Sequence, residues 1–153
     1  MRIISFISGF LISVILLVAA IAKILRPWDL LVLIDRGGAV FEIFFAIALL
    51  LFNQRAWMWL FSSVVFANWA GYSLFWTIQE LPCTCMGTLV EVPRGFFLGL
   101  GLIFFVSSIL LAYFHSWNKQ EITWFLLFSL VFGVFGYFFG KWAYIEYVLP
   151  TLS

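Results

Sequence analysis

The sequence predicts an all-α fold, a polytopic bundle of transmembrane helices. Hydrophobic residues make up 65% of the 153 residues, aromatic residues 22% and charged residues only 10%. Water-soluble domains are about 45–50% apolar and about 25% charged, so this composition excludes a water-soluble fold. The apolar residues form five runs separated by short polar segments, and a helix needs about 20 residues to cross a bilayer. Because no repeat or linker divides the chain, we expect residues 1–153 to form a single integral membrane domain.

The first predicted span covers residues 3–25 and stops before Pro27. Its length corresponds to roughly 34 Å of helix at 1.5 Å per residue, which is enough to cross the hydrocarbon core. Ala20-Ile21-Ala22 has the form of a signal-peptidase site, but the run exceeds the usual h-region of about 7–15 residues, and only Arg2 precedes it. We therefore expect a retained span.

Four further spans are predicted after the first. A connection runs through Gly37 and Gly38 to the second span, at residues 39–52, which reaches a full length only if the helix begins earlier, near Leu31. The remaining spans are predicted at residues 56–78, 95–114 and 122–140. The longest polar segment, residues 79–94, joins the third span to the fourth.

Small residues at four-residue spacing predict where these helices pack closely. In lipid, helices associate through close packing rather than hydrophobic burial, and small side chains allow their backbones to approach. The spacing occurs at Ala67 and Gly71, at Gly95 and Gly99, and at Gly136 and Gly140. We interpret all three pairs as internal packing positions.

The charged residues exclude nucleic acid as a partner and give conflicting indications of which side of the membrane the cysteines face. The net charge is +1, and no basic stripe of the kind that binds nucleic acid is present. The predicted side that holds the cysteines carries five basic residues against three on the other side: Lys23, Arg26, Arg36, Arg94 and Lys141 against Arg2, Arg55 and Lys119. The positive-inside rule alone would therefore place the cysteines in the cytoplasm. We favour the extracytoplasmic side, because the margin is small and a persistent disulfide belongs in an oxidising compartment.

Cys83 and Cys85, in the polar segment before the fourth span, are the candidate catalytic residues. A disulfide prefers Cα atoms about 5.5 Å apart and a dihedral angle near 90°, so a ring closed across one residue is strained. Strained disulfides are readily reduced, which suits thiol exchange. Gly87 leaves room for a partner backbone, and Arg94 is the nearest positive group that stabilises a thiolate.

Two other interpretations of this pair stay open. The cysteines are either inert or structural, as in a non-enzymatic membrane assembly or maturation factor, or they handle copper, since Cys83, Cys85 and Met86 are ligands that Cu(I) favours. Against a metal site, His115 is predicted on the opposite membrane face, and no second cysteine pair completes a tetrahedral set. We therefore predict no metal site and favour the redox interpretation.

Lys23 and Glu42 are the informative charges near the apolar runs. Ionisable groups at membrane depth are costly and usually pair or line a cavity. Lys23 ends the first span and Glu42 begins the second, both towards the cysteine segment, so we predict an ion pair between them. This pair is either purely structural or part of a polar pocket for a proton or a quinone headgroup. Asn68, in the middle of the third span, predicts an interhelical hydrogen bond.

The segment Cys83-Thr84-Cys85-Met86-Gly87 resembles the Cys-X-Cys-Phe-Gly signature of the MauE branch of the MauE/DoxX-like redox-associated membrane proteins. Further points of likeness are Ala22-Lys23-Ile24-Leu25 before a proline, Glu42 early in the second span and Arg94 before the fourth. The likeness covers roughly residues 15–115, and Met86 replaces the usual aromatic residue. It implies a four-helix core with the fifth, C-terminal span outside it.

This resemblance implies a function in forming or transferring disulfides outside the cytoplasm, as in methylamine utilisation. The expected partner is a thioredoxin-like protein or another extracytoplasmic redox protein, and the expected location is the bacterial inner membrane. The resemblance also implies thiol-disulfide oxidoreductase activity through Cys83 and Cys85. Lys23, Glu42, Gly87 and Arg94 are the expected supporting residues. A membrane quinone is the candidate electron acceptor, and it rests on the membrane location and on the polar pair.

Overall fold

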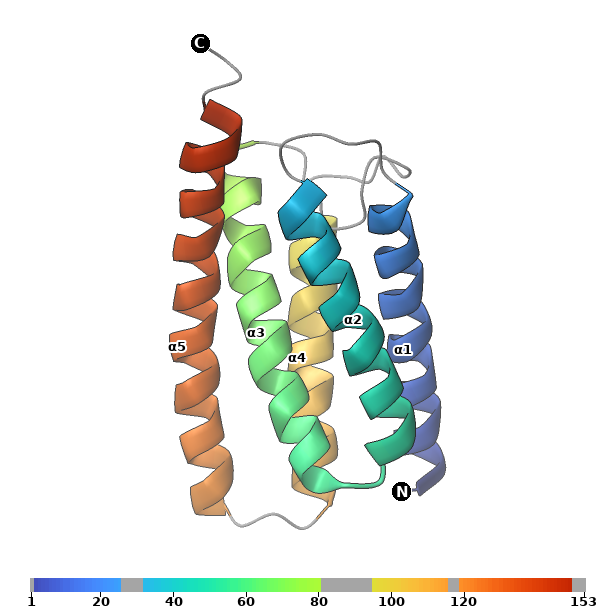
Figure 1. Ribbon diagram of the computed structural model, residues 1–153. Coiled ribbons are helices and arrows are strands. Elements are labelled where there is room, and N and C mark those ends of the chain that lie inside the picture. Colours follow the sequence, from blue (N-terminus) through green and yellow to red (C-terminus); the bar gives the residue numbers. More distant parts are fainter. Residues whose placement is uncertain (1, 26–31, 81–94, 116–118, 150–153) are drawn as a thin grey trace.

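The computed structural model is an antiparallel bundle of long helices (Figure 1), described over residues 2–25, 32–80, 95–115 and 119–149. Its elements are α1 (Arg2–Ile24), α2 (Val32–Phe52), α3 (Ala56–Ile78), α4 (Phe96–Phe114) and α5 (Lys119–Ala143), and a π-helical turn, η2 (Tyr144–Val148), continues α5. The described residues contain no strand. The all-α prediction is confirmed.

Three of these helices are long and apolar enough to cross a membrane, over Ile3–Ile24, Phe96–Phe114 and Gln120–Glu146. The chain is therefore a membrane protein by the length and composition of its helices. Helices α2 and α3 are long enough but less apolar, because they contain more polar residues. Helix α2 carries three charged residues, and α3 contains several serines and tryptophans and Asn68, which lower its hydropathy.

Helix α2 begins at Val32, close to the earlier start near Leu31 that a full-length span requires, and not at residue 39. Gly37 and Gly38, predicted as part of a connection, lie inside this helix. Glycine disfavours a helix by about 1 kcal/mol relative to alanine, but backbone groups at membrane depth must be hydrogen-bonded within the helix itself. The predicted third span coincides with α3, whereas α5 extends beyond the predicted 122–140 at both ends.

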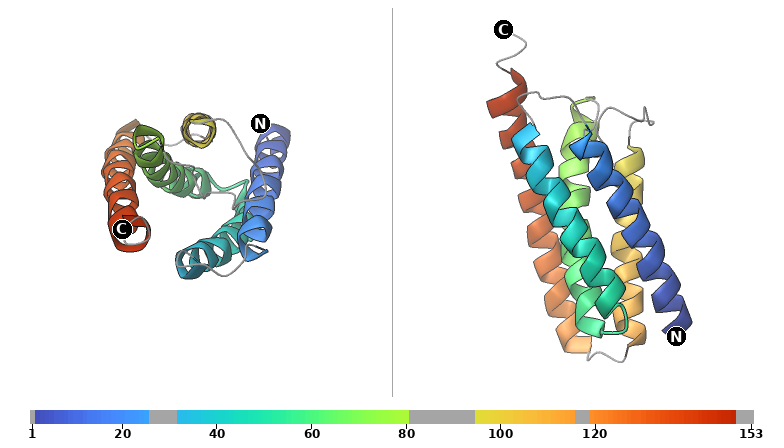
Figure 2. Two further views of the ribbon diagram at one scale, coloured as in Figure 1. Left: turned by 90° about the horizontal axis from the view of Figure 1, so that it is seen from above. Right: turned by 45° about the vertical axis from the view of Figure 1, so that its right-hand side comes forward.

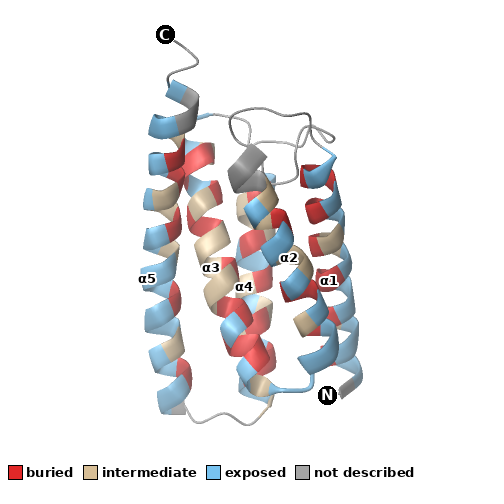
Figure 3. Ribbon diagram, in the orientation of Figure 1, coloured by how far each residue is buried: buried red, intermediate tan, exposed pale blue. Residues whose placement is uncertain are grey.

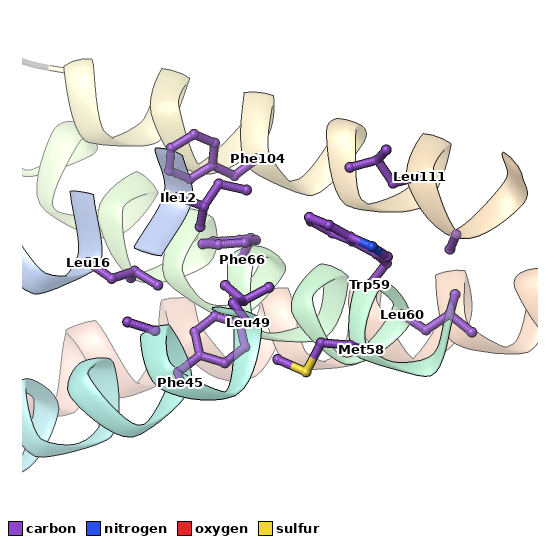
Figure 4. Close-up of a cluster of buried hydrophobic side chains, with 12 residues drawn as sticks. Ile12, Leu16, Phe45, Leu49, Met58, Trp59, Leu60, Phe66, Phe104 and Leu111 are labelled. Atoms are coloured by element: carbon purple, nitrogen blue, oxygen red, sulfur yellow. The ribbon is translucent and has the colours of Figure 1, made fainter. Parts of the chain in front are cut away.

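The helices fall into two closely packed groups, as Figure 2 shows from above. Helix α1 packs along α2, and α3 packs along both α4 and α5. Large side chains fill the space between the groups. They form one core cluster to which α1, α2, α3 and α4 contribute, around Phe45, Trp59, Phe66 and Phe104 (Figure 4). The Phe66 ring stands at its centre, with ring centroids 5.8 Å from Phe45 and 5.1 Å from Phe104.

Helix α5 is the most exposed of the three spanning helices (Figure 3). Only 17% of its apolar segment is buried, against 39% in α1 and 33% in α4. Its outward face carries large apolar side chains, among them Phe128, Val131, Phe135 and Phe138. In a bilayer this face would lie against lipid tails, so its exposure carries no cost there.

Glycines join α5 to α3. A Cβ atom at Gly71 of α3 would collide with the backbone carbonyl of Gly133 on α5, and one at Gly136 would collide with the carbonyl of Asn68. At Gly140 it would lie 3.2 Å from the Phe75 side chain. Backbones approach this closely only where a side chain is absent. Gly71, Gly136 and Gly140 therefore pack as predicted.

The predicted pair Gly95 and Gly99 does not pack in this way. Gly95 precedes α4 in a left-handed conformation, with φ 79°, and a Cβ atom at Gly99 would meet no described atom within 4 Å. The four-residue spacing alone did not distinguish a glycine that precedes the first turn of a helix from one that packs against a neighbouring helix.

Buried serine hydroxyls bond to backbone carbonyls at Ser13, Ser62 and Ser63, and some of them connect neighbouring helices. Ser13 of α1 donates to the Ala46 carbonyl of α2 at 3.0 Å, and the Ser63 and Ser129 hydroxyls of α3 and α5 lie 3.2 Å apart. Asn68 differs from the prediction. Its Oδ1 is buried against Gly136 and accepts no hydrogen bond from any described residue, because glycine offers no side-chain donor there.

Candidate functional site

The predicted cysteine site falls outside the described residues. Cys83, Cys85, Gly87 and Arg94 all lie in the segment 81–94, and so does Met86. What the structure describes is the frame of that segment. Helix α3 ends and α4 begins at the same end of the bundle as the C-terminal end of α1 and the N-terminal end of α2 (Figure 1). The cysteine segment is therefore attached at the end that carries Lys23.

Left-handed residues stand at both edges of the segment. Glu80, after α3, has φ 57°, and Gly95, before α4, has φ 79°. The Glu80 N–H donates to the Thr77 carbonyl at 3.2 Å, which helps to close the last turn of α3. A left-handed residue after the last helical turn is a common way to end a helix, although glycine usually occupies it. Both helices thus have defined ends where the cysteine segment is attached.

The expected ion pair between Lys23 and Glu42 is present, and it joins α1 to α2. Lys23 Nζ donates to Glu42 Oε1, and the two side chains are only 9% and 14% exposed. Lys23 follows Ala19 and Ala20, which are buried on the inward face of α1, and Glu42 follows the buried Ala39 on α2. The pair therefore lies in the interior of the bundle, between the aromatic core and the end that carries the cysteine segment.

Gly38 lies beside this ion pair. A Cβ atom at Gly38 would lie 4.0 Å from Lys23 Nζ and would meet no other described atom within that distance. Gly38 precedes Glu42 by four residues, so both lie on one face of α2. Sequence analysis missed the role of Gly38. The signal was a glycine one turn before a buried carboxylate, and it became visible only once α2 was known to begin at Val32.

The opposite end of the bundle carries His115, as expected. Its Nδ1–H donates to the Leu111 carbonyl at 2.8 Å, and Nε2 lies 3.5 Å from the Ser5 hydroxyl oxygen of α1. His115 therefore joins the end of α4 to the start of α1. Over the described ranges, no group of three or more His, Cys, Asp or Glu residues is placed to hold a metal ion.

Comparisons with known proteins found no relative of this chain. No protein-family model, no curated protein and no solved structure matches the chain. Function is therefore inferred from two features, the Cys-X-Cys pair and the buried Lys23–Glu42 ion pair below its attachment points.

Proposed function

We propose that this chain is a membrane thiol-disulfide exchange protein of the MauE/DoxX-like type, in which Cys83 and Cys85 cycle between disulfide and dithiol. The observation that carries the proposal is the Cys-Thr-Cys spacing within a polar segment of an otherwise apolar protein. The Lys23–Glu42 ion pair supports it, because both residues belong to the same resemblance and Lys23 lies in the last turn of α1, at the end where this segment is attached. Glu42, expected at the start of the second span, lies in the middle of α2 and is reached there by the Lys23 side chain.

The exchange balances with a partner dithiol as the reductant. A partner thiolate attacks one sulfur of the Cys83–Cys85 disulfide, and the S–S bond breaks to give a mixed disulfide and a free thiolate, which takes up a proton. The second partner thiolate then attacks the mixed disulfide. The partner leaves with a disulfide, having lost two electrons and two protons, and Cys83 and Cys85 are left as thiols. A membrane quinone that becomes a hydroquinone would accept the same two electrons and two protons when the pair is reoxidised.

The proposal includes five spans, arranged as a four-helix core with α5 added to it. Helices α2 and α3 have 21 and 23 residues, or roughly 32 and 35 Å at 1.5 Å per residue, which suffices for a bilayer. They lie alongside the helices that qualify as spans (Figure 1). We place the chain in a bacterial inner membrane with the cysteine segment outside, where an oxidising compartment maintains disulfides.

Thiol tagging in intact cells tests this proposal, because the chain has only two cysteines. We expect a maleimide mass tag that cannot cross the membrane to add two tags after mild reduction and none before it. Each single variant, Cys83→Ser or Cys85→Ser, should take one tag without reduction. Its remaining thiolate can also attack the disulfide of an oxidised partner and release one partner thiolate. The product is a larger, reducible mixed disulfide, which no second cysteine of this chain resolves.

The double variant Cys83→Ser/Cys85→Ser is the control and should take no tag. Two tags without reduction would mean that the resting pair is a dithiol, which contradicts a disulfide-donating function. Tagging only in opened cells would place the pair in the cytoplasm and overturn the proposed orientation.

A further inference from the structure

The Lys23 ammonium has more hydrogen-bond donors than the surrounding helices satisfy. A lysine ammonium carries three N–H donors. Across the described ranges its one acceptor is Glu42 Oε1, although its side chain is only 9% exposed. Unpaired donors in a nearly water-free interior are costly, so a further acceptor beside Nζ would be favourable.

The missing side chain of Gly38 leaves space for such an acceptor. Apart from the neighbouring residues and backbone of α2 itself, Lys23 Nζ is the one described atom within 4 Å of the position that a Cβ atom at Gly38 would take. Gly38 is half-buried, and the next residue outward, Gly37, is exposed, with no described atom within 4 Å of its own Cβ position. Among the described residues, the surface over these two glycines is therefore open to a slender group that approaches Nζ.

Charge decides what kind of group this is. Lys23 and Glu42 already neutralise each other, so a charged ligand would bring a further charge into their largely buried surroundings at a desolvation cost. The flanking inward residues Ala20 and Ala39 are fully buried and offer no polar side chain. A neutral acceptor satisfies the donors without adding charge, and a carbonyl oxygen is the simplest such group.

The surroundings also indicate from which phase the group comes. The outward residues beside the pair, Ile21 on α1 and Phe41 on α2, are apolar and about half exposed, as lipid-facing side chains are. Lys23 itself lies in the last turn of the apolar stretch Ile3–Ile24. The molecule that bears the carbonyl must therefore be soluble in the membrane.

We propose that Lys23, Gly38 and Glu42 form a binding site for a carbonyl oxygen of a membrane-soluble molecule, either a quinone or a lipid ester. The Lys23 ammonium donates to this oxygen, Glu42 orients and neutralises the ammonium, and Gly38 supplies the space. This site goes beyond thiol exchange and does not depend on Cys83 or Cys85.

The test is a binding titration of the full chain, purified in dodecyl maltoside, a detergent without a carbonyl group. Decylubiquinone and dioleoylphosphatidylcholine are titrated separately by calorimetry. The matched variants are Gly38→Leu, which fills the space beside Nζ, and Gly37→Leu, which makes the same change where the neighbouring space is open. We expect Gly38→Leu to bind about tenfold or more weakly, the loss typical of one hydrogen bond to a charged group, and Gly37→Leu to bind like the natural chain.

The neutral double variant Lys23→Met/Glu42→Leu removes the donor without leaving a buried charge, and it should lose the same affinity. Saturable binding of decylubiquinone alone identifies a quinone site, and binding of the phospholipid with the same dependence on Gly38 identifies a lipid-ester site. Binding of neither molecule, or equal binding by Gly38→Leu and Gly37→Leu, overturns the proposal. Cys83→Ser/Cys85→Ser should bind like the natural chain, so failure of the proposed thiol chemistry is recognised separately.

Discussion

Replacing Lys23 by methionine is expected to destabilise the protein by about 3–5 kcal/mol, the cost of breaking a buried ion pair from one side. Methionine has a similar length but no charge, so the Glu42 carboxylate, 14% exposed, loses the ammonium that neutralises it. Chemical unfolding of the purified protein in detergent, followed by helix content, measures this loss. Glu42→Leu should cost a similar amount, because it leaves the Lys23 ammonium alone in the interior.

The double variant Lys23→Met/Glu42→Leu separates pairing from packing. Replacing both members of a buried pair by apolar residues of similar size is often neutral or even stabilising, so we expect stability close to that of the natural chain. The coupling energy then approaches the sum of the two single losses. Lys141→Met makes the same change at an exposed position and should lower stability by less than about 1 kcal/mol. Additive single losses would show that the two charges do not stabilise each other.

Gly71→Ala is expected to separate α3 from α5 and to lower the unfolding free energy by about 1–3 kcal/mol or more. The added methyl group would collide with the backbone carbonyl of Gly133, which no side-chain rotation can move aside. Gly136→Ala makes the matching collision from α5 with the Asn68 carbonyl and should give a loss of similar size. The midpoint of thermal unfolding in detergent measures both.

Gly99→Ala on α4 is the control, since no described atom lies within 4 Å of its Cβ position. Alanine favours a helix by about 0.5–1 kcal/mol over glycine, so this variant should unfold at the same temperature as the natural chain or higher. If Gly71→Ala and Gly99→Ala unfold at the same temperature, the α3–α5 contact is not the close backbone approach described above.

The prediction of the helices succeeded where a boundary has a local chemical signal. The polar turn Asn53-Gln54-Arg55 separates α2 from α3, and α3 begins at Ala56 as predicted. Gly37 and Gly38 suggested a connection, whereas the helix passes through them, and only the length that a span requires indicated a start near Leu31.

The candidate site, too, was predicted only in part. The charges of Lys23 and Glu42 predicted their pairing, since isolated charges at membrane depth are costly. The position of Gly38 beside the ammonium was not predicted, because it depends on the rotation of α1 relative to α2. Asn68 was expected to bond across helices, yet its Oδ1 meets the backbone of Gly136, which offers no side-chain donor.

The sequence by itself determined that the chain is helical, that it belongs in a membrane, and that Lys23 needs Glu42. These properties depend on composition, on the length of apolar runs and on the cost of a buried charge, all of which are local or pairwise. Only the tertiary structure decided which glycines pack, that α5 joins the bundle through α3, and that Gly38 opens a space beside the ammonium. Each of these depends on how a helix is rotated and shifted against its neighbour, and similar small-residue spacings fit several such arrangements.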